Sequence, residues 1–230
     1  MRSESSKMVL LRCSNCGSDL SGLPTDVIFY CGSCGRCWIS GEKLRPVKID
    51  FIRTGGPGAV LLPFWKVDAS VCIGNRVTRK RTSISSLEGT REFSGRERGL
   101  SGEASETRKD RFIFPAFSTS LVLSIGVKMH RENFLPERTQ HGLEYSVRGG
   151  AVDMDDACIL ARGVAVGTEV NRSDFLASVE LDIEVVSASI YAIGCTPKEH
   201  YFVVNGSEIS FPCSAVRDSD LILDSISKKQ

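Results

Sequence analysis

Apolar and polar residues alternate along two stretches of the chain, and a period of two is typical of β-strands that bury one face. Residues 65–73 place large apolar side chains at every second position, and residues 179–185 place them between three acids. The alternation changes phase at Val185–Val186, which predicts a β-bulge before the strand continues through residues 188–193. We therefore expect two half-buried strands.

Two shorter apolar runs predict further strands. Residues 49–52 and 111–117 are rich in isoleucine and phenylalanine, which favour β-structure. A turn is expected between the first of these runs and the next strand, at the glycine-rich residues 55–58. Its glycines do not match a phosphate-binding loop, because no Gly-Lys-Ser/Thr follows them.

A β-hairpin is expected near the C-terminal end of the sequence. Asn205-Gly206 separates two apolar runs, and this dipeptide favours a two-residue type I′ turn. Such a turn places Phe202 opposite Ile209 and Val204 opposite Ser207.

Helical periodicity is weaker and is confined to short segments. Residues 121–129 fit both a helix and a strand, and we favour a helix that Ser118 or Ser120 caps. Two more short helices are expected, one over residues 173–178 and one after Asp218.

A further helix is expected to begin at Asp153 and to end at Gly163. Asp153 fits the N-cap, and a glycine commonly follows the last turn. A magnesium site would also use the carboxylates of Asp153, Asp155 and Asp156. We favour the capping interpretation, because acidic residues in the first turn stabilise the positive end of a helix.

Residues 74–110 show neither period and carry many charges, so we predict a flexible charged loop there. The basic cluster Arg76–Arg81 lies within it. Such a cluster can contact phosphates, but the interleaved aromatic residues of a single-strand binding surface are missing.

These elements predict an α+β fold: a mainly antiparallel β domain with a few short helices over residues 49–230, preceded by a disordered start at residues 1–8. Of the 230 residues, 41% are hydrophobic and 25% are charged, which is typical of globular proteins and unlike disordered or membrane chains. The net charge of +1 gives the whole molecule no bias towards polyanions.

Two Cys-x-x-Cys-Gly motifs near the N-terminus carry the clearest chemistry in the sequence. Cys13 and Cys16 are followed by Gly17, and Cys31 and Cys34 are followed by Gly35. A Cys-x-x-Cys turn directs two sulfurs at one point, and the glycine can adopt the positive φ that closes the turn. Two such turns predict a tetrahedral metal site with four thiolate ligands.

This spacing resembles the zinc-ribbon superfamily over residues 9–41. The resemblance implies that Cys13, Cys16, Cys31 and Cys34 bind one structural Zn²⁺ ion. The superfamily includes transcription factors, nucleic-acid enzymes, ribosomal proteins and assembly factors, so the resemblance implies a metal and a fold without a single function.

Cys37 offers a third thiol in the same register as Cys31 and Cys34, and it could replace Cys34 or lie beside the site. A rubredoxin-like iron site is the less favoured metal, and disulfides are a further alternative. Four thiolates leave no open coordination position, so the metal is expected to hold structure rather than to catalyse hydrolysis.

No catalytic motif stands out in the rest of the chain, and its three histidines are isolated. A cysteine nucleophile stays possible, because its histidine partner need not be close in sequence. We therefore expect a non-enzymatic adaptor or assembly component that acts through contacts with an unknown protein partner. The alternative is a nucleic-acid-binding protein that uses the ribbon and the basic cluster Arg76–Arg81.

The expected compartment is the cytoplasm. The nine cysteines suit a reducing environment, and the first residues lack the apolar core of a secretory signal. No membrane span is expected, because the longest apolar runs have the length of a strand.

Overall fold

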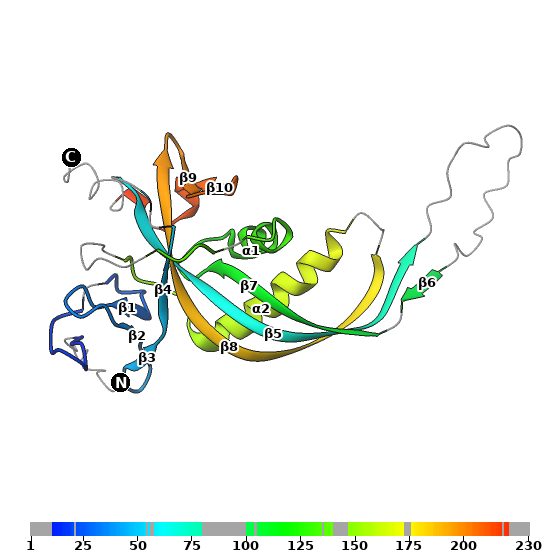
Figure 1. Cartoon of the computed structure of the whole chain (residues 1–230), viewed down its shortest axis with the longest axis horizontal. Helices are drawn as coiled ribbons and strands as arrows, with labels where there is room; N and C mark the ends of the chain where they lie inside the picture. Colours follow the sequence, from blue (N-terminus) through cyan, green and yellow to red (C-terminus); the bar gives the residue numbers. More distant parts are fainter. Residues whose placement is uncertain are drawn as a thin grey trace, which may run out of the picture.

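Two long strands form the axis of the molecule (Figure 1). The computed structural model describes residues 11–220 except 21, 54, 56–57, 80–99, 104, 135, 140–146, 173–175 and 218. Within this part, β5 (Val60–Arg79) and β8 (Leu176–Lys198) pair in antiparallel orientation along most of their length. They contain both alternating stretches, so the two predicted strands are confirmed.

A seven-stranded, mainly antiparallel sheet is built on this pair. β7 and β6 pair with β5, β9 extends β8 towards β10, and β4 is parallel to β8. With two helices beside this sheet, the α+β class is confirmed. The further strands are β4 (Ile49–Ile52), β6 (Leu100–Glu103), β7 (Glu106–Pro115), β9 (Tyr201–Val204) and β10 (Ser210–Pro212).

The predicted bulge lies in β8 at Val186. Asp68 pairs with Ser187 and the next residue of β5, Ala69, pairs with Val185, so Val186 has no opposite residue. Its side chain is 69% exposed. The change of phase in the sequence therefore located the bulge correctly.

The helix α2 (Met154–Val170) begins as expected but is longer than expected. Asp153 is the N-cap, and its carboxylate accepts a hydrogen bond from the amide of Asp156 at 2.8 Å. The helix continues through Gly163, where we predicted its end. Helix packing explains the difference, because a Cβ at Gly163 would lie 2.8 Å from Leu123 of the neighbouring helix.

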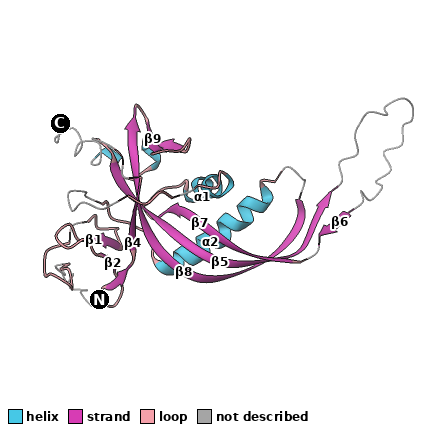
Figure 2. Ribbon diagram, in the orientation of Figure 1, coloured by secondary structure: helices cyan, strands magenta, loops and turns pink. Residues whose placement is uncertain are grey.

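That neighbour, α1 (Val122–Arg131), confirms the helix favoured for residues 121–129. Its predicted cap is wrong. Neither Ser118 nor Ser120 caps it; Leu121 is the N-cap residue, without a side-chain cap, and its amide donates to Thr119 Oγ1 at 3.1 Å. α1 and α2 pack against each other beside the sheet (Figure 2).

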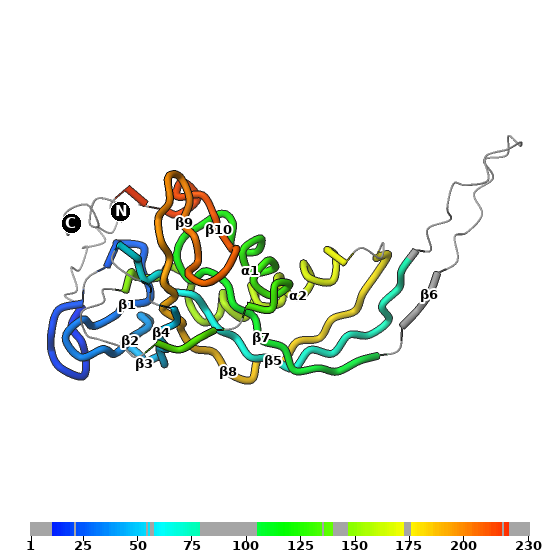
Figure 3. Tube along the Cα trace, turned by 45° about the horizontal axis from the view of Figure 1, so that its top comes forward, coloured from blue at the N-terminus to red at the C-terminus, as the bar shows by residue number. Residues whose placement is uncertain are grey.

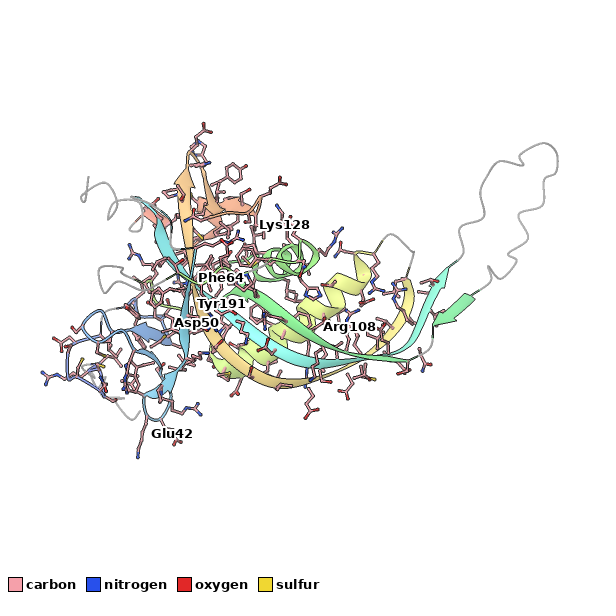
Figure 4. All side chains as sticks on the ribbon, viewed as in Figure 1. Glu42, Asp50, Phe64, Arg108, Lys128 and Tyr191 are labelled. Atoms are coloured by element: carbon pink, nitrogen blue, oxygen red, sulfur yellow. The ribbon has the colours of Figure 1, made fainter. Side chains whose placement is uncertain are left out.

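The two faces of β5 enter different parts of the core. The odd-numbered side chains from Trp65 to Ile73 pack with α2. Leu62 and Phe64 pack instead with α1 and the β9–β10 hairpin. Phe64 pairs with Tyr191, and Asp50 of β4 pairs with Tyr191 from the other side, which places the three labelled side chains together where β4, β5 and β8 meet (Figure 4).

The loop predicted for residues 74–110 is wrong at both of its ends, where the structure has strands. β5 continues to Arg79, β6 follows at Leu100, and β7 starts at Glu106. β5, β7 and β8 run side by side away from the rest of the sheet (Figure 3), and β6 pairs with the end of β5. These outer strand segments, which we call the arm, pair through their backbones but lack alternating apolar residues. Periodicity in the sequence therefore could not reveal them. Residues 80–99 lie outside the described part.

Two further local predictions are corrected. The helix expected over residues 173–178 is wrong, because β8 begins at Leu176 and pairs with the end of β5. The hairpin register is also wrong, since Phe202 lies opposite Phe211. The connection is wider than a two-residue turn, and the Ser207 hydroxyl bonds the backbone of Val204 and Ile209 to close it. Because side chains alternate with a period of two, a shift by two residues leaves Phe202, Ile209 and Phe211 on the buried face, as predicted. The helix expected after Asp218 lies almost entirely outside the described residues.

Candidate metal centre

The two Cys-x-x-Cys motifs form two separate turns with the same geometry. The amide of Gly17 donates to the carbonyl of Cys13 at 2.8 Å, and the amide of Gly35 donates to that of Cys31 at the same distance. The two glycines have φ of 74° and 73°, which other residues rarely adopt. The sequence pattern therefore predicted the backbone geometry of both turns.

The two turns bring four sulfurs together. The Sγ atoms of Cys13, Cys16, Cys31 and Cys34 all lie within 4.8 Å of one another. The Cys13–Cys34 and Cys16–Cys31 sulfur distances are 3.5 Å. A tetrahedral ion with metal–sulfur bonds of about 2.3 Å needs sulfurs about 3.8 Å apart. The four cysteines therefore lie close enough to hold one metal ion.

The surroundings of the four thiols differ. Hydrogen bonding to Ser18 lowers the pKa of the exposed Cys16 to about 6. Burial raises the pKa of Cys31 to about 11. Burial alone would raise the pKa of Cys13, but backbone hydrogen bonds from Cys16 and Asn15 lower it overall. A cation bound to all four would favour the thiolate form of each.

A small sheet supports the cysteines. It consists of β1 (Ile28–Tyr30), β2 (Cys37–Ile39) and β3 (Arg45–Val47) in antiparallel order. The third strand lies beyond residue 41, where we expected the module to end. We call residues 11–47 the cysteine module.

The two faces of this small sheet have different roles. Phe29 and Trp38 pack with Cys13 and Cys31 in a core of their own. Cys37 points to the other face and packs with Trp65 of the large sheet. The structure therefore separates Cys37 from the four clustered cysteines, and burial raises its pKa to about 12.

The cysteine module is joined to the large sheet by backbone and side-chain contacts. Ile28 and Gly150 exchange hydrogen bonds of 2.9 and 3.1 Å. Ile28 and Ile39 enter the same buried cluster as Trp65. The rings of Tyr30 and Phe51 pack edge to face with centroids 5.9 Å apart. The module and the β domain therefore share a core.

The other candidate residues are dispersed. Arg76, the first residue of the predicted basic cluster, is 2% exposed and its Nε bonds Glu169 at 3.0 Å. Lys80 and Arg81 lie outside the described residues. Cys72, Cys158, Cys195 and Cys213 do not join the metal cluster found among the described residues.

Sequence reasoning missed two hollows in the surface. A groove of about 660 Å³ lies between α1 and α2, and a cavity of about 540 Å³ lies between β7 and the end of α1. Both combine residues that are distant in sequence. The signal for the groove was the glycine pair Gly163 and Gly167, of which we interpreted Gly163 as a helix end.

Comparison with known proteins gives no match: no family model, no curated protein and no solved structure is similar to this chain at a significant level. Among the described helices, none combines the length and apolar character needed to cross a bilayer.

Proposed function

We propose that the four clustered cysteines bind one structural Zn²⁺ ion and that the cysteine module is a zinc ribbon. Two identical knuckles and an antiparallel sheet support this assignment, as does a donor set of four thiolates. Metal analysis of the purified protein should find about one zinc per chain, and Cys31→Ser should lose it. One iron per chain, with the colour of an iron–thiolate site, would show that the bound metal is iron instead of zinc. The absence of both metals would overturn the assignment.

We further propose that the protein is a non-enzymatic adaptor that binds a partner through the groove between α1 and α2. The observation that carries this is an exposed apolar stripe on α2. Ile159, Val166 and Val170 are 64%, 42% and 58% exposed, and they recur at helical spacing on one side of the helix. Leu123 of α1, 46% exposed, lies in the adjoining groove. Clustered exposed apolar residues of this kind mark interaction surfaces.

The charges beside the stripe define the partner. Lys128 and Arg131 of α1 line the groove, and Lys128 is labelled at α1 in Figure 4. Glu132, also in the lining, is 3.8 Å from Lys128. Arg162 adds an exposed cation to α2 between Ile159 and Val166. A partner helix with one apolar face flanked by acidic residues would complement this surface.

A model peptide tests the groove. The probe is a synthetic amphipathic helix with leucines on one face and flanking glutamates, and its counterpart carries lysines in place of the glutamates. Fluorescence anisotropy should show saturable binding of the acidic peptide only. Val166→Glu should weaken this binding about tenfold or more, because it places a carboxylate in the apolar stripe. Val186→Glu, at an even more exposed valine on the sheet, is the control and should bind as wild type.

Three results would contradict the adaptor proposal. The first is equal binding of the two peptides, or none. The second is wild-type self-association in sedimentation experiments that Val166→Glu abolishes, which would make a second copy the occupant. The third is tight binding of short RNA or DNA with a steep dependence on salt, which would support the nucleic-acid alternative.

A further inference from the structure

The cavity between β7 and the C-terminal end of α1 is separate from the α1–α2 groove, because the two share no lining residue. β5 and β7 contribute sheet residues to it. The end of α1, the segment that follows and the bulged Val186 contribute the rest. Its volume of about 540 Å³ is in the range of small-molecule sites.

The lining changes from cationic to apolar along β7. Lys109, Arg111 and Ile113 occupy alternate positions and therefore share one face of the strand. At about 3.3 Å per residue, the three side chains cover roughly 13 Å. Met129 and Phe134, which are 1% and 9% exposed, continue the apolar part beside Ile113.

The charges on this face favour an anion. The Asp68 carboxylate is already engaged, since it accepts from Arg111 Nε at 2.8 Å, from the Ser187 hydroxyl at 3.0 Å and from Lys66. Lys109 makes no ion pair with any residue that the structure describes. Asp110, the second carboxylate of the lining, accepts from Arg108 Nε at 2.7 Å. In and beside the cavity, the four cations Lys66, Arg108, Lys109 and Arg111 therefore outnumber the two carboxylates by two charges. Glu184, the next acid on this face, lies two strands from Lys109, about 10 Å away.

The wall formed by the end of α1 and the residues after it is held in place by contacts within the protein. His130 bonds the backbone carbonyl of Arg111 through Nδ1 at 3.3 Å, and its ring lies against Phe112 with centroids 5.1 Å apart. Asn133 has φ of 48°, a left-handed conformation that asparagine tolerates better than most residues. It turns the chain after α1 so that Phe134 packs in the core.

We propose that this cavity binds a small amphipathic anion, with its anionic group at Lys109 and Arg111 and its apolar chain or ring along Ile113, Met129 and Phe134. Val186 lies at the rim near the proposed anionic group, because its neighbour Ser187 pairs with Asp68, which pairs in turn with Arg111. A chain of about eight carbons matches the length of the lining along β7.

Three probes of equal length separate the contributions of charge and apolar surface. Octanoate, 1-octanol and octylammonium are titrated into the full-length, metal-loaded protein, and binding is followed by calorimetry and by amide NMR shifts. Octanoate should bind with one site per chain and should shift the amides of β7, the end of α1 and Val186. Octanol should bind about tenfold more weakly or worse, and octylammonium should not bind.

Two variants test the residues. Lys109→Gln should weaken octanoate binding about tenfold, and Val186→Glu should abolish it by adding a carboxylate to the rim. Val166→Glu, in the separate α2 stripe, should bind octanoate as wild type. Zinc content and circular dichroism equal to wild type would show that each variant is folded.

Equal affinity for all three probes would overturn the proposal, because nonspecific apolar binding ignores the charge of the headgroup. Unsaturable binding, amide shifts confined to other surfaces, or the same loss in Val166→Glu would also overturn it. Peptide binding at the α1–α2 groove is measured separately, so either proposal can fail while the other holds.

Discussion

At the scale of single residues, identical side chains behave differently because of what surrounds them. The nine cysteines divide into four that cluster and five that are buried or half-buried elsewhere in the fold. Sequence spacing identified the cluster, because each pair of thiols lies within one tight turn. It could not place Cys37, since its direction depends on the pleat of β2 and on the contact with Trp65.

Alkylation should distinguish the isolated cysteines. Burial raises the pKa of Cys37 to about 12 and raises the pKa of Cys195, so both remain protonated thiols at pH 7.5 and are inaccessible to reagent. Iodoacetamide followed by peptide mass spectrometry should modify the half-buried Cys72 and Cys158 first. Rapid modification of Cys195 in the native protein would mean that the core around it is open.

One buried carboxylate holds three arginines at the base of the arm. Glu169 of α2 accepts from Arg76 Nε at 3.0 Å, from Arg108 at 3.2 Å and from Arg172 at 3.1 Å. Arg108 also bonds Asp110 at 2.7 Å; the label in Figure 4 shows it beside α2. Sequence reasoning assigned Arg76 to a solvated loop because its partner lies 93 residues away.

Removing this carboxylate should be costly. Glu169→Gln leaves the guanidinium of Arg76 buried without the charge of Glu169 beside it, and we expect a loss of about 3–5 kcal/mol in the free energy of unfolding. Urea denaturation would measure it. The pair Glu169→Leu with Arg76→Met should recover much of the loss, because both charges leave together. A loss below about 1 kcal/mol in Glu169→Gln would show that solvent reaches the cluster.

At the scale of elements, alternation located β5 and β8, while the close packing of the helices was hidden in single glycines. Gly163 and Gly167 of α2 and Gly126 of α1 lie where the two helices meet or where α1 meets the sheet. A glycine inside a helix is indistinguishable from a terminal glycine when only one chain segment is considered. This is the physical reason for the premature end that we predicted for α2.

Gly126 gives the sharpest test of that packing. A Cβ there would lie 2.6 Å from Val164 and 3.0 Å from Phe114 Cβ. Gly126→Ala should therefore destabilise the protein by about 1–3 kcal/mol, although alanine is the better helix former. Ser124→Ala, an exposed position on the same helix, should be neutral or slightly stabilising in the same thermal melts. A more stable Gly126→Ala protein would mean that α1 can move away from α2.

At the scale of the whole molecule, the fold class followed from the sequence but the union of its two parts did not. One face of the small sheet in the cysteine module packs with clustered cysteines, and the other face packs with the large sheet. No local pattern reveals this, because Ile28 and Trp65 belong to strands that meet only in the folded chain. Their shared core means that a metal ion bound by the four cysteines would support more than the module itself.

Metal removal should therefore also lower the stability of the β domain. Chelation, or Cys31→Ser, should unfold the cysteine module, because a small domain of this kind obtains much of its folding free energy from the ion. The strands of the large sheet should remain in far-UV circular dichroism, but their melting temperature should fall as the apolar surface under Ile28 and Ile39 becomes exposed.

Trp65 reports this exposure directly. In a Trp38→Phe background it is the only tryptophan of the chain, and its indole Nε1 bonds the carbonyl of Val152 at 2.9 Å within the shared core. Its emission should shift to longer wavelength on chelation and return when zinc is added. The half-exposed Cys158→Ser variant is the control and should keep both the metal and the emission maximum. Unchanged Trp65 emission after complete zinc loss would show that the module remains docked without its ion.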